Sequence, residues 1–180
     1  METEPKNPPS TKTPAGIGFT DRLLSNEEIE SVLDEAFANW DLDDKKVLIA
    51  IPDGTRTCPL DMLFPIIYKR LAGRVELLDF IIALGTHLPM SEEQICERVG
   101  IQPDEQQTVY PKARFFNHAW DDPEQLTEIG VMSSDEISKV SDGRFQQTLS
   151  VKCNRMVREY DLLLICGPVF PHEIAGFSGG

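Results

Sequence analysis

The 180-residue sequence has no long apolar run and little positive charge. No apolar stretch reaches the roughly 18 residues that a membrane-spanning helix needs, so we expect no membrane partner. The net charge of -13 would repel a nucleic-acid backbone, so we expect no nucleic-acid partner either. The polar, proline-rich N-terminus is unlike a signal peptide, which favours a cytoplasmic protein.

The sequence also lacks any pattern typical of structural cysteines. None of its four cysteines forms a CxxC pair, and none lies at metal-site spacing from a histidine. We therefore expect plain thiols in a reducing compartment, with Cys166 buried in a strand. The other three are Cys58, Cys96 and Cys153.

The rest of the composition is that of a soluble globular protein, with 41% hydrophobic and 26% charged residues. Residues 1–18 carry no apolar periodicity and predict a flexible tail. Residues 19–180 are long enough to bury the core of one domain. The sequence therefore predicts one domain after a short tail.

Helical and strand patterns alternate along this domain. Apolar periodicity and capping residues predict helices over 26–39, 60–71 and 92–99, and short apolar runs predict strands over 46–52, 75–84, 113–117 and 161–166. A further strand is expected over 148–152 and a short helix over 154–159, whereas 125–147 has no readable pattern and 167–180 is expected to be a loop. This order predicts an α/β domain, Rossmann-like, with a largely parallel sheet and helices on both faces.

The polar residues of interest follow the ends of the predicted strands. They are Asp53, Arg56, His87, His118 and His172. Ligands of open parallel sheets bind at the carboxyl ends of the strands, so this distribution is typical of a site.

Each of these features also has a purely structural explanation. The residues 53–56 could form a simple turn, and His87 could be an ordinary surface-loop histidine. His118 could be structural, with a neighbouring aspartate that holds its ring. The glycine-rich residues 171–180 could turn the chain or present amides to a phosphate.

Taken together, these residues resemble the nickel-pincer lactate racemase family (LarA-like proteins), as the N-terminal domain of a two-domain enzyme. The matching motifs are, in order, Asp53, Gly54, Thr55 and Arg56 with Pro59, then Gly85, Thr86 and His87 with Pro89, then Asn117 and His118 with Asp121, and finally PHEIAGFSGG over 171–180. The resemblance covers about residues 20–180, and its last motif is the most specific.

The resemblance implies racemisation or epimerisation of lactate or a related α-hydroxyacid. Hydride would move from the α-carbon to a nickel-pincer nucleotide (nickel pyridinium-3,5-bisthiocarboxylate mononucleotide) and back. It implies His87 and His172 as the catalytic acid/base pair and Arg56 as the substrate-carboxylate ligand. It also implies that Asp53, Gly54, Thr55 and Arg56 contact the cofactor.

The same resemblance implies that parts of the enzyme lie beyond residue 180. The cofactor-attachment lysine, the nickel-binding histidine and the second domain are expected there, so we expect no metal ligand within this chain and no activity of the chain alone. Its expected partners are the small α-hydroxyacid, the missing C-terminal domain and the cofactor-synthesis proteins. Gly54, Thr57 and Leu88 depart from common family residues, which leaves the choice of α-hydroxyacid open.

Two other functions remain open from the residues. The chain could be a non-catalytic α/β module that binds a nucleotide or a partner at the same sheet edge. It could also be a zinc hydrolase, in which case all three histidines would converge on one metal.

Overall fold

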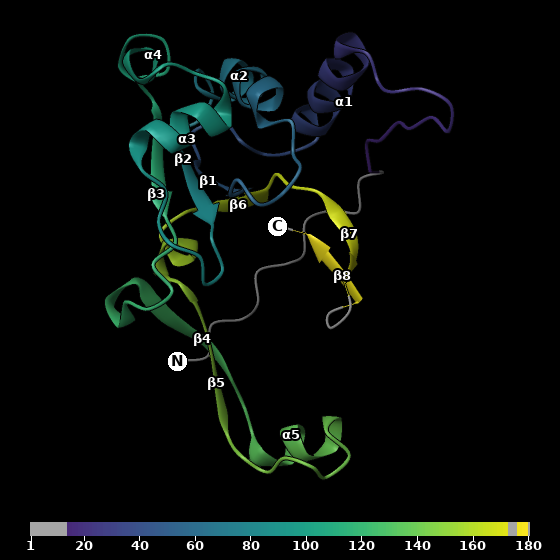
Figure 1. Cartoon of the computed structure of the whole chain (residues 1–180), viewed down its shortest axis with the longest axis vertical. Helices are drawn as coiled ribbons and strands as arrows, with labels where there is room; N and C mark the ends of the chain where they lie inside the picture. Colours follow the sequence, from purple (N-terminus) through teal and green to yellow (C-terminus); the bar gives the residue numbers. More distant parts are fainter. Residues whose placement is uncertain (1–13, 173–175, 180) are drawn as a thin grey trace. The chain divides into compact units, whose positions relative to one another are not determined.

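The computed structural model describes residues 14–172 and 176–179, and divides the chain into two compact units, Met1–Asp41 and Leu42–Gly180 (Figure 1). The predicted tail lies outside the described residues as far as residue 13, and residues 14–18 form neither helix nor strand. Among the described residues, no helix is long and apolar enough to cross a membrane.

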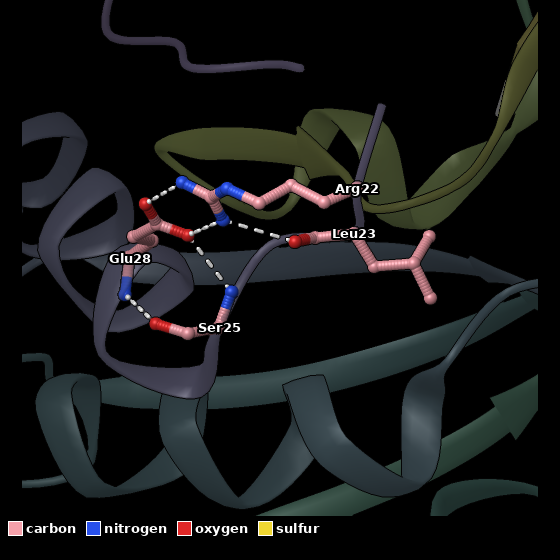
Figure 2. A network of polar contacts seen from close by, with 4 residues as sticks. All are labelled: Arg22, Leu23, Ser25 and Glu28. Atoms are coloured by element: carbon pink, nitrogen blue, oxygen red, sulfur yellow. Dashed lines mark hydrogen bonds and ion pairs between the residues drawn. The ribbon is translucent and has the colours of Figure 1, made fainter. Parts of the chain in front are cut away.

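The first unit contains helix α1 (Asn26–Ala38), which begins with the predicted capping box. The Ser25 hydroxyl accepts the Glu28 amide at 3.3 Å, and Glu28 accepts the Ser25 amide at 2.9 Å. Figure 2 shows that Arg22 also pairs with Glu28, at 2.6 and 2.7 Å. The Arg22 hydrogen bonds, together with the Ser25 amide, lower the pKa of Glu28 to about 2. The carboxylate thus stays charged at the positive end of the helix.

The second unit is built on a parallel sheet of four strands in the order β3-β2-β1-β6. These strands are β1 (Lys46–Pro52), β2 (Leu77–Ala83), β3 (Ala113–Asn117) and β6 (Leu162–Ile165). All three pairings are parallel, which confirms the predicted α/β fold. The two central strands are almost wholly buried, as expected for continuous apolar runs inside a parallel sheet.

Helix α2 (Leu60–Leu71) packs on this sheet through aromatic rings. The ring of Phe64 lies 5.2 Å from that of Phe80 and 5.5 Å from that of Phe115. Helix α3 (Glu92–Val99) contacts α2 and is followed by the short helix α4 (Pro103–Thr108).

A buried carboxylate holds together the other face of the sheet. Side chains alternate along a strand, so Asp79 points away from the face on which Phe80 meets α2. Asp79 is fully buried; the Nε of Arg114 donates to it at 2.8 Å, and the hydroxyl of Tyr160 donates to it as well. A buried charge is tolerated only with such partners, so this cluster fastens β2, β3 and the residue pair before β6.

The remaining elements include two antiparallel strand pairs (Figure 1). One is β4 (Leu126–Met132) with β5 (Leu149–Asn154), and the segment between them contains α5 (Ser134–Val140). The short 3-10 helices η1 (Pro123–Gln125) and η2 (Arg155–Arg158) flank this pair. The pair was unreadable in the sequence for the most part because exposed residues of both kinds occupy both faces of β4.

The second pair corrects a prediction. Residues 167–180 were expected to form a loop, but β7 (Val169–His172) pairs with β8 (Gly176–Gly179). The glycines predicted a loop, yet ladder hydrogen bonds use backbone groups that glycine also has. The central part of the glycine-rich motif, residues 173–175, lies outside the described residues, as does residue 180.

Candidate active site

A pocket of about 350 Å³ opens at the carboxyl ends of the parallel strands. Its wall comes from three segments that are far apart in the sequence: the turn after β1, the turn after β2, and the residues from Pro168 to Phe170 after β6. This is the sheet edge at which the sequence predicted a site. The lining residues are Pro52, Asp53, Thr55, Arg56, Ala83, Leu84, Gly85, Thr86, His87, Pro168 and Phe170.

Asp53 and His87 form the most defined contact in this pocket. Oδ2 of Asp53 lies 2.6 Å from Nδ1 of His87. Oδ1 accepts the backbone amide of Thr55 at 3.0 Å and its hydroxyl at 2.5 Å. Both carboxylate oxygens are therefore engaged within the chain.

The pKa of Asp53 reflects two opposed effects. Burial, which leaves only 5% of the residue exposed, raises the pKa by itself. The hydrogen bonds from Thr55 and His87 outweigh that effect, so the net pKa lies below its usual value of 3.8. Asp53 is consequently ionised at neutral pH.

An ionised Asp53 determines the tautomer of His87. A carboxylate can only accept hydrogen bonds, so Nδ1 of His87 must carry the proton. In the neutral imidazole, Nε2 is then the basic nitrogen. The His87 side chain is 53% exposed, whereas that of Asp53 is only 7% exposed, so the acid is held inside and the ring is accessible.

Arg56 supplies positive charge to the same pocket. Its guanidinium carbon lies 5.4 Å from the centre of the Phe170 ring, within the range of a cation–π contact. A guanidinium held in this way can grip a carboxylate through two parallel hydrogen bonds. Phe170 was not predicted as a site residue, because nothing in the sequence brings the strand after β6 beside Arg56.

The turn that carries His87 is held by two further features. Gly85 has φ +59°, a conformation that favours glycine. The side chain of Asn117 bonds both backbone groups of Met90, accepting the amide at 3.0 Å and donating to the carbonyl at 2.9 Å. Asn117 belongs to a motif quoted from the sequence, but its action on Met90 depends on β3 lying beside β2.

The other predicted site residues lie near this pocket or away from it. Gly54 lines a neighbouring hollow of about 370 Å³ together with Asp53, His87 and the exposed Leu88. His172, at the end of β7, does not line the 350 Å³ pocket, although its neighbour Phe170 does.

The histidines give no support to a zinc site. The three histidines are all among the described residues, and no group of three or more histidine, cysteine or acidic residues there is arranged to hold a metal. His118 instead lies against Asn154, with 3.2 Å between its Nδ1 and the amide nitrogen. The partner suggested by the sequence was an aspartate.

Two cysteines that are far apart in the sequence meet at the same sheet edge. The backbone amide of Cys166 donates to Ala50 of β1 at 2.9 Å. Burial, the charge of Cys58 and a hydrogen bond with the Cys58 thiol raise the pKa of Cys166 to about 12. Both thiols are free, as predicted, but the sequence spacing had not indicated that they are neighbours.

Comparison with known proteins places this site in a family. Residues 20–180 match the family model of the lactate racemase N-terminal domain. The chain belongs to this family. It is 24% identical, over 172 residues, to the lactate racemase of Lactiplantibacillus plantarum, which covers 90% of this chain. A crystal structure of a protein from Thermotoga maritima matches 87% of the chain with a TM-score of 0.74 and 28% identity.

Membership of the lactate racemase N-terminal domain family confirms the predicted resemblance and agrees with the parallel sheet. The chain spans about a third of the length of these relatives, 35% of the racemase and 36% of the Thermotoga protein. The roles of the individual residues in this domain remain predictions.

Proposed function

We propose that this domain supplies acid/base and carboxylate-binding groups to a racemase or epimerase of lactate or a related α-hydroxyacid. The proposal rests above all on one observation: the Asp53–His87 pair and the Arg56 guanidinium line one pocket at the carboxyl edge of the sheet. The family membership supports the reaction class, because a member of known name is a lactate racemase.

Arg56 is proposed to bind the substrate carboxylate. The pocket volume of about 350 Å³ is within the range of small-molecule sites and accommodates a three-carbon hydroxyacid. The Phe170 ring against the guanidinium limits the orientations of Arg56, so that less side-chain entropy is lost when the acid binds.

His87 is proposed to exchange a proton with the substrate hydroxyl. Its Nδ1 proton is directed to Asp53, which leaves Nε2 to accept the hydroxyl proton as the α-carbon loses hydride. The hydroxyacid then becomes the planar ketoacid. Return of hydride and proton to the opposite face of that plane gives the other enantiomer.

His172 is proposed as the base for the opposite face. Residues i and i+2 of a strand share a face, so His172 lies on the same face of β7 as Phe170, roughly 7 Å farther along. Phe170 is the residue of β7 that meets Arg56 and lines the pocket. This relation supports a place for His172 at the edge of the substrate pocket.

The cofactor proposed for this reaction is a nickel-pincer nucleotide, whose chemistry when bound is reversible acceptance of hydride. The residues fit its anionic part. Gly54 borders a hollow, and a Cβ at that position would meet no atom within 4 Å, so a ligand can approach the backbone there. Asp53, Thr55 and Arg56 are proposed to line the same approach.

The nickel ion itself does not fit the described residues, because no suitable group of metal-binding side chains occurs among them. We therefore assign no nickel ligand to this part of the chain. A lysine and a histidine elsewhere in the full protein are proposed for attachment and nickel binding, together with a second domain and cofactor-synthesis proteins as partners. A cytoplasmic location remains part of this proposal.

The test uses the protein encoded by the full coding sequence, produced together with the cofactor-synthesis proteins. Mass spectrometry is expected to reveal a lysine adduct that contains sulfur and nickel, and chiral chromatography is expected to show interconversion of an α-hydroxyacid. Replacement of His87 or His172 by Gln is expected to remove turnover while the adduct remains.

Absence of both the adduct and turnover would refute the racemase proposal and favour a non-catalytic binding module. Full turnover of the His172→Gln variant would refute the two-histidine arrangement alone. Strict preference for lactate over larger hydroxyacids would show that Leu88, exposed beside the site, does not widen the substrate range.

A further inference from the structure

We propose that Arg98, on α3, is a positioning residue that holds the turn carrying Asp53 and Arg56 in its active shape. This inference rests on the proposed function, because it concerns the same pocket. Arg98 does not line that pocket, and the sequence had not marked it as part of a site.

The observation is that one guanidinium bonds three carbonyls of a single turn. Nε donates to the carbonyl of Pro52 at 3.3 Å, Nη2 to that of Arg56 at 2.9 Å, and Nη1 to that of Cys58 at 3.1 Å. The bonded carbonyls enclose the whole segment from the end of β1 to the residue before α2. Asp53 lies just after the first of them, and Arg56 carries the second.

The turn has few other bonds that could fix its shape. Within it, the amide of Arg56 donates to the carbonyl of Asp53 at 3.4 Å, a long hydrogen bond. Thr55 bonds the Asp53 side chain, which orders the start of the turn. The carbonyls of Arg56 and Cys58 point to Arg98 instead, so this side chain orders the second half.

Arg98 is itself held firmly enough for this task. It lies in the last turn of α3, a helix with a capping box at Ser91 and a left-handed Gly100 at its end. Gly100 allows close approach to α2, because a Cβ there would lie 2.6 Å from the Cβ of Asp61. The packing of α3 on α2 therefore determines where the guanidinium lies.

The chemistry requires arginine at this position. A guanidinium presents donors from three nitrogens in one plane, which matches three carbonyls in different directions. A lysine ammonium keeps the charge but is a single point donor on a flexible stem. Arg98→Lys therefore separates the geometry of the contact from its charge.

The experiment compares Arg98→Lys and Arg98→Gln with Arg114→Gln in two measurements. Arg114 is the matched control, because it also holds a buried partner, Asp79, but on the other face of the sheet. The first measurement is amide hydrogen exchange of residues 53–58 in this chain. The second is the KM and kcat of α-hydroxyacid racemisation by the full, cofactor-loaded protein.

We expect both Arg98 variants to speed exchange in residues 53–58 at least 10-fold, with the β2 and β3 amides unchanged. We expect KM to rise roughly 10- to 100-fold, because a small displacement of a binding group costs about that much. The Arg114 variant is expected to lose thermal stability without a change in KM.

Each other outcome decides against the proposal or against a different one. Unchanged exchange in a folded Arg98→Lys variant would overturn the role of Arg98, and so would faster exchange with unchanged KM. If the wild-type protein shows no racemisation, the proposed function fails, whereas the exchange measurement still decides whether Arg98 holds the turn. Should Arg98→Gln fail to fold, Arg98→Lys alone decides.

Discussion

Asp53 and His87 are 34 residues apart in the sequence, yet their side chains meet at 2.6 Å at the edge of the parallel sheet. β1 and β2 are neighbours in register, Pro52 opposite Ala83, so the turns that follow them emerge side by side. A carboxylate from one turn thereby holds the imidazole from the next. Most of the expected behaviour of the site depends on this relationship.

Replacement of Asp53 by Asn is expected to reduce turnover of the full, cofactor-loaded protein by roughly 10²- to 10⁴-fold. The amide can donate to Nδ1 of His87, which favours the tautomer whose Nε2 carries the proton and cannot act as base. The kcat of racemisation measures this effect. KM is expected to change little, since Arg56 is intact, and an unchanged kcat would contradict the assigned orienting role.

Replacement of Arg56 by Lys is expected to raise KM for the hydroxyacid roughly 10-fold or more, because a charged hydrogen bond contributes about 1.5–3 kcal/mol. Lysine retains the charge but loses the two-pronged grip. Phe170→Leu is the companion variant, expected to have a smaller effect in the same direction through loss of the cation–π contact. A normal KM for Arg56→Lys would show that the carboxylate binds elsewhere.

Replacement of Gly100 by Ala is expected to reduce the free energy of unfolding by about 1–3 kcal/mol. Gly100 has φ +73°, and the new Cβ would lie 2.6 Å from the Cβ of Asp61. Urea unfolding of the chain measures the change. Gly73→Ala is the matched control, since a Cβ there meets no atom within 4 Å, and equal losses in both variants would refute the steric explanation.

The Cys166 thiol is expected to react slowly with iodoacetamide at neutral pH. Its pKa is raised from 9.0 to about 12, first by burial and then by the Cys58 thiol, so almost no thiolate is present. Since the folded-state pKa is the higher one, the thiol favours folding below pH 9, and this contribution is lost as the pH rises from about 9 towards 12.

Mass spectrometry of alkylated peptides measures the reactivity of Cys166 in the native chain and in urea. We expect a much faster reaction in urea, where the pKa of the thiol is near its ordinary value of 9.0. Equal rates in both states would contradict the burial of this thiol. A Cys58→Ala variant is the control for the second cause, and its Cys166 is expected to react faster than in the wild type.

Much of the fold could be predicted from local patterns. The runs that became β1, α2 and β3 were predicted with the observed bounds, because continuous apolar strands and an apolar helical stripe depend on neighbouring residues. The β4 and β7–β8 elements were not predicted. Their stability depends on pairing with another strand, which exposed or glycine-rich segments do not signal.

The candidate site shows the same division. Asp53, Arg56 and His87 could be identified because each follows a predicted strand, and parallel strands bring such ends to one edge. Phe170 and Arg98 could not, since their relevance depends on a ring beside Arg56 and on three carbonyls in reach of α3. The proximity of Cys58 and Cys166 was hidden for the same reason.

The sequence by itself determined the α/β alternation, the family and the chemical groups at the strand ends, because those depend on residue type and order along the chain. Only the tertiary structure decided which of these groups touch. Contacts such as that of Asp53 with His87 depend on strand order and on the packing of α3, and they are properties of the folded chain as a whole.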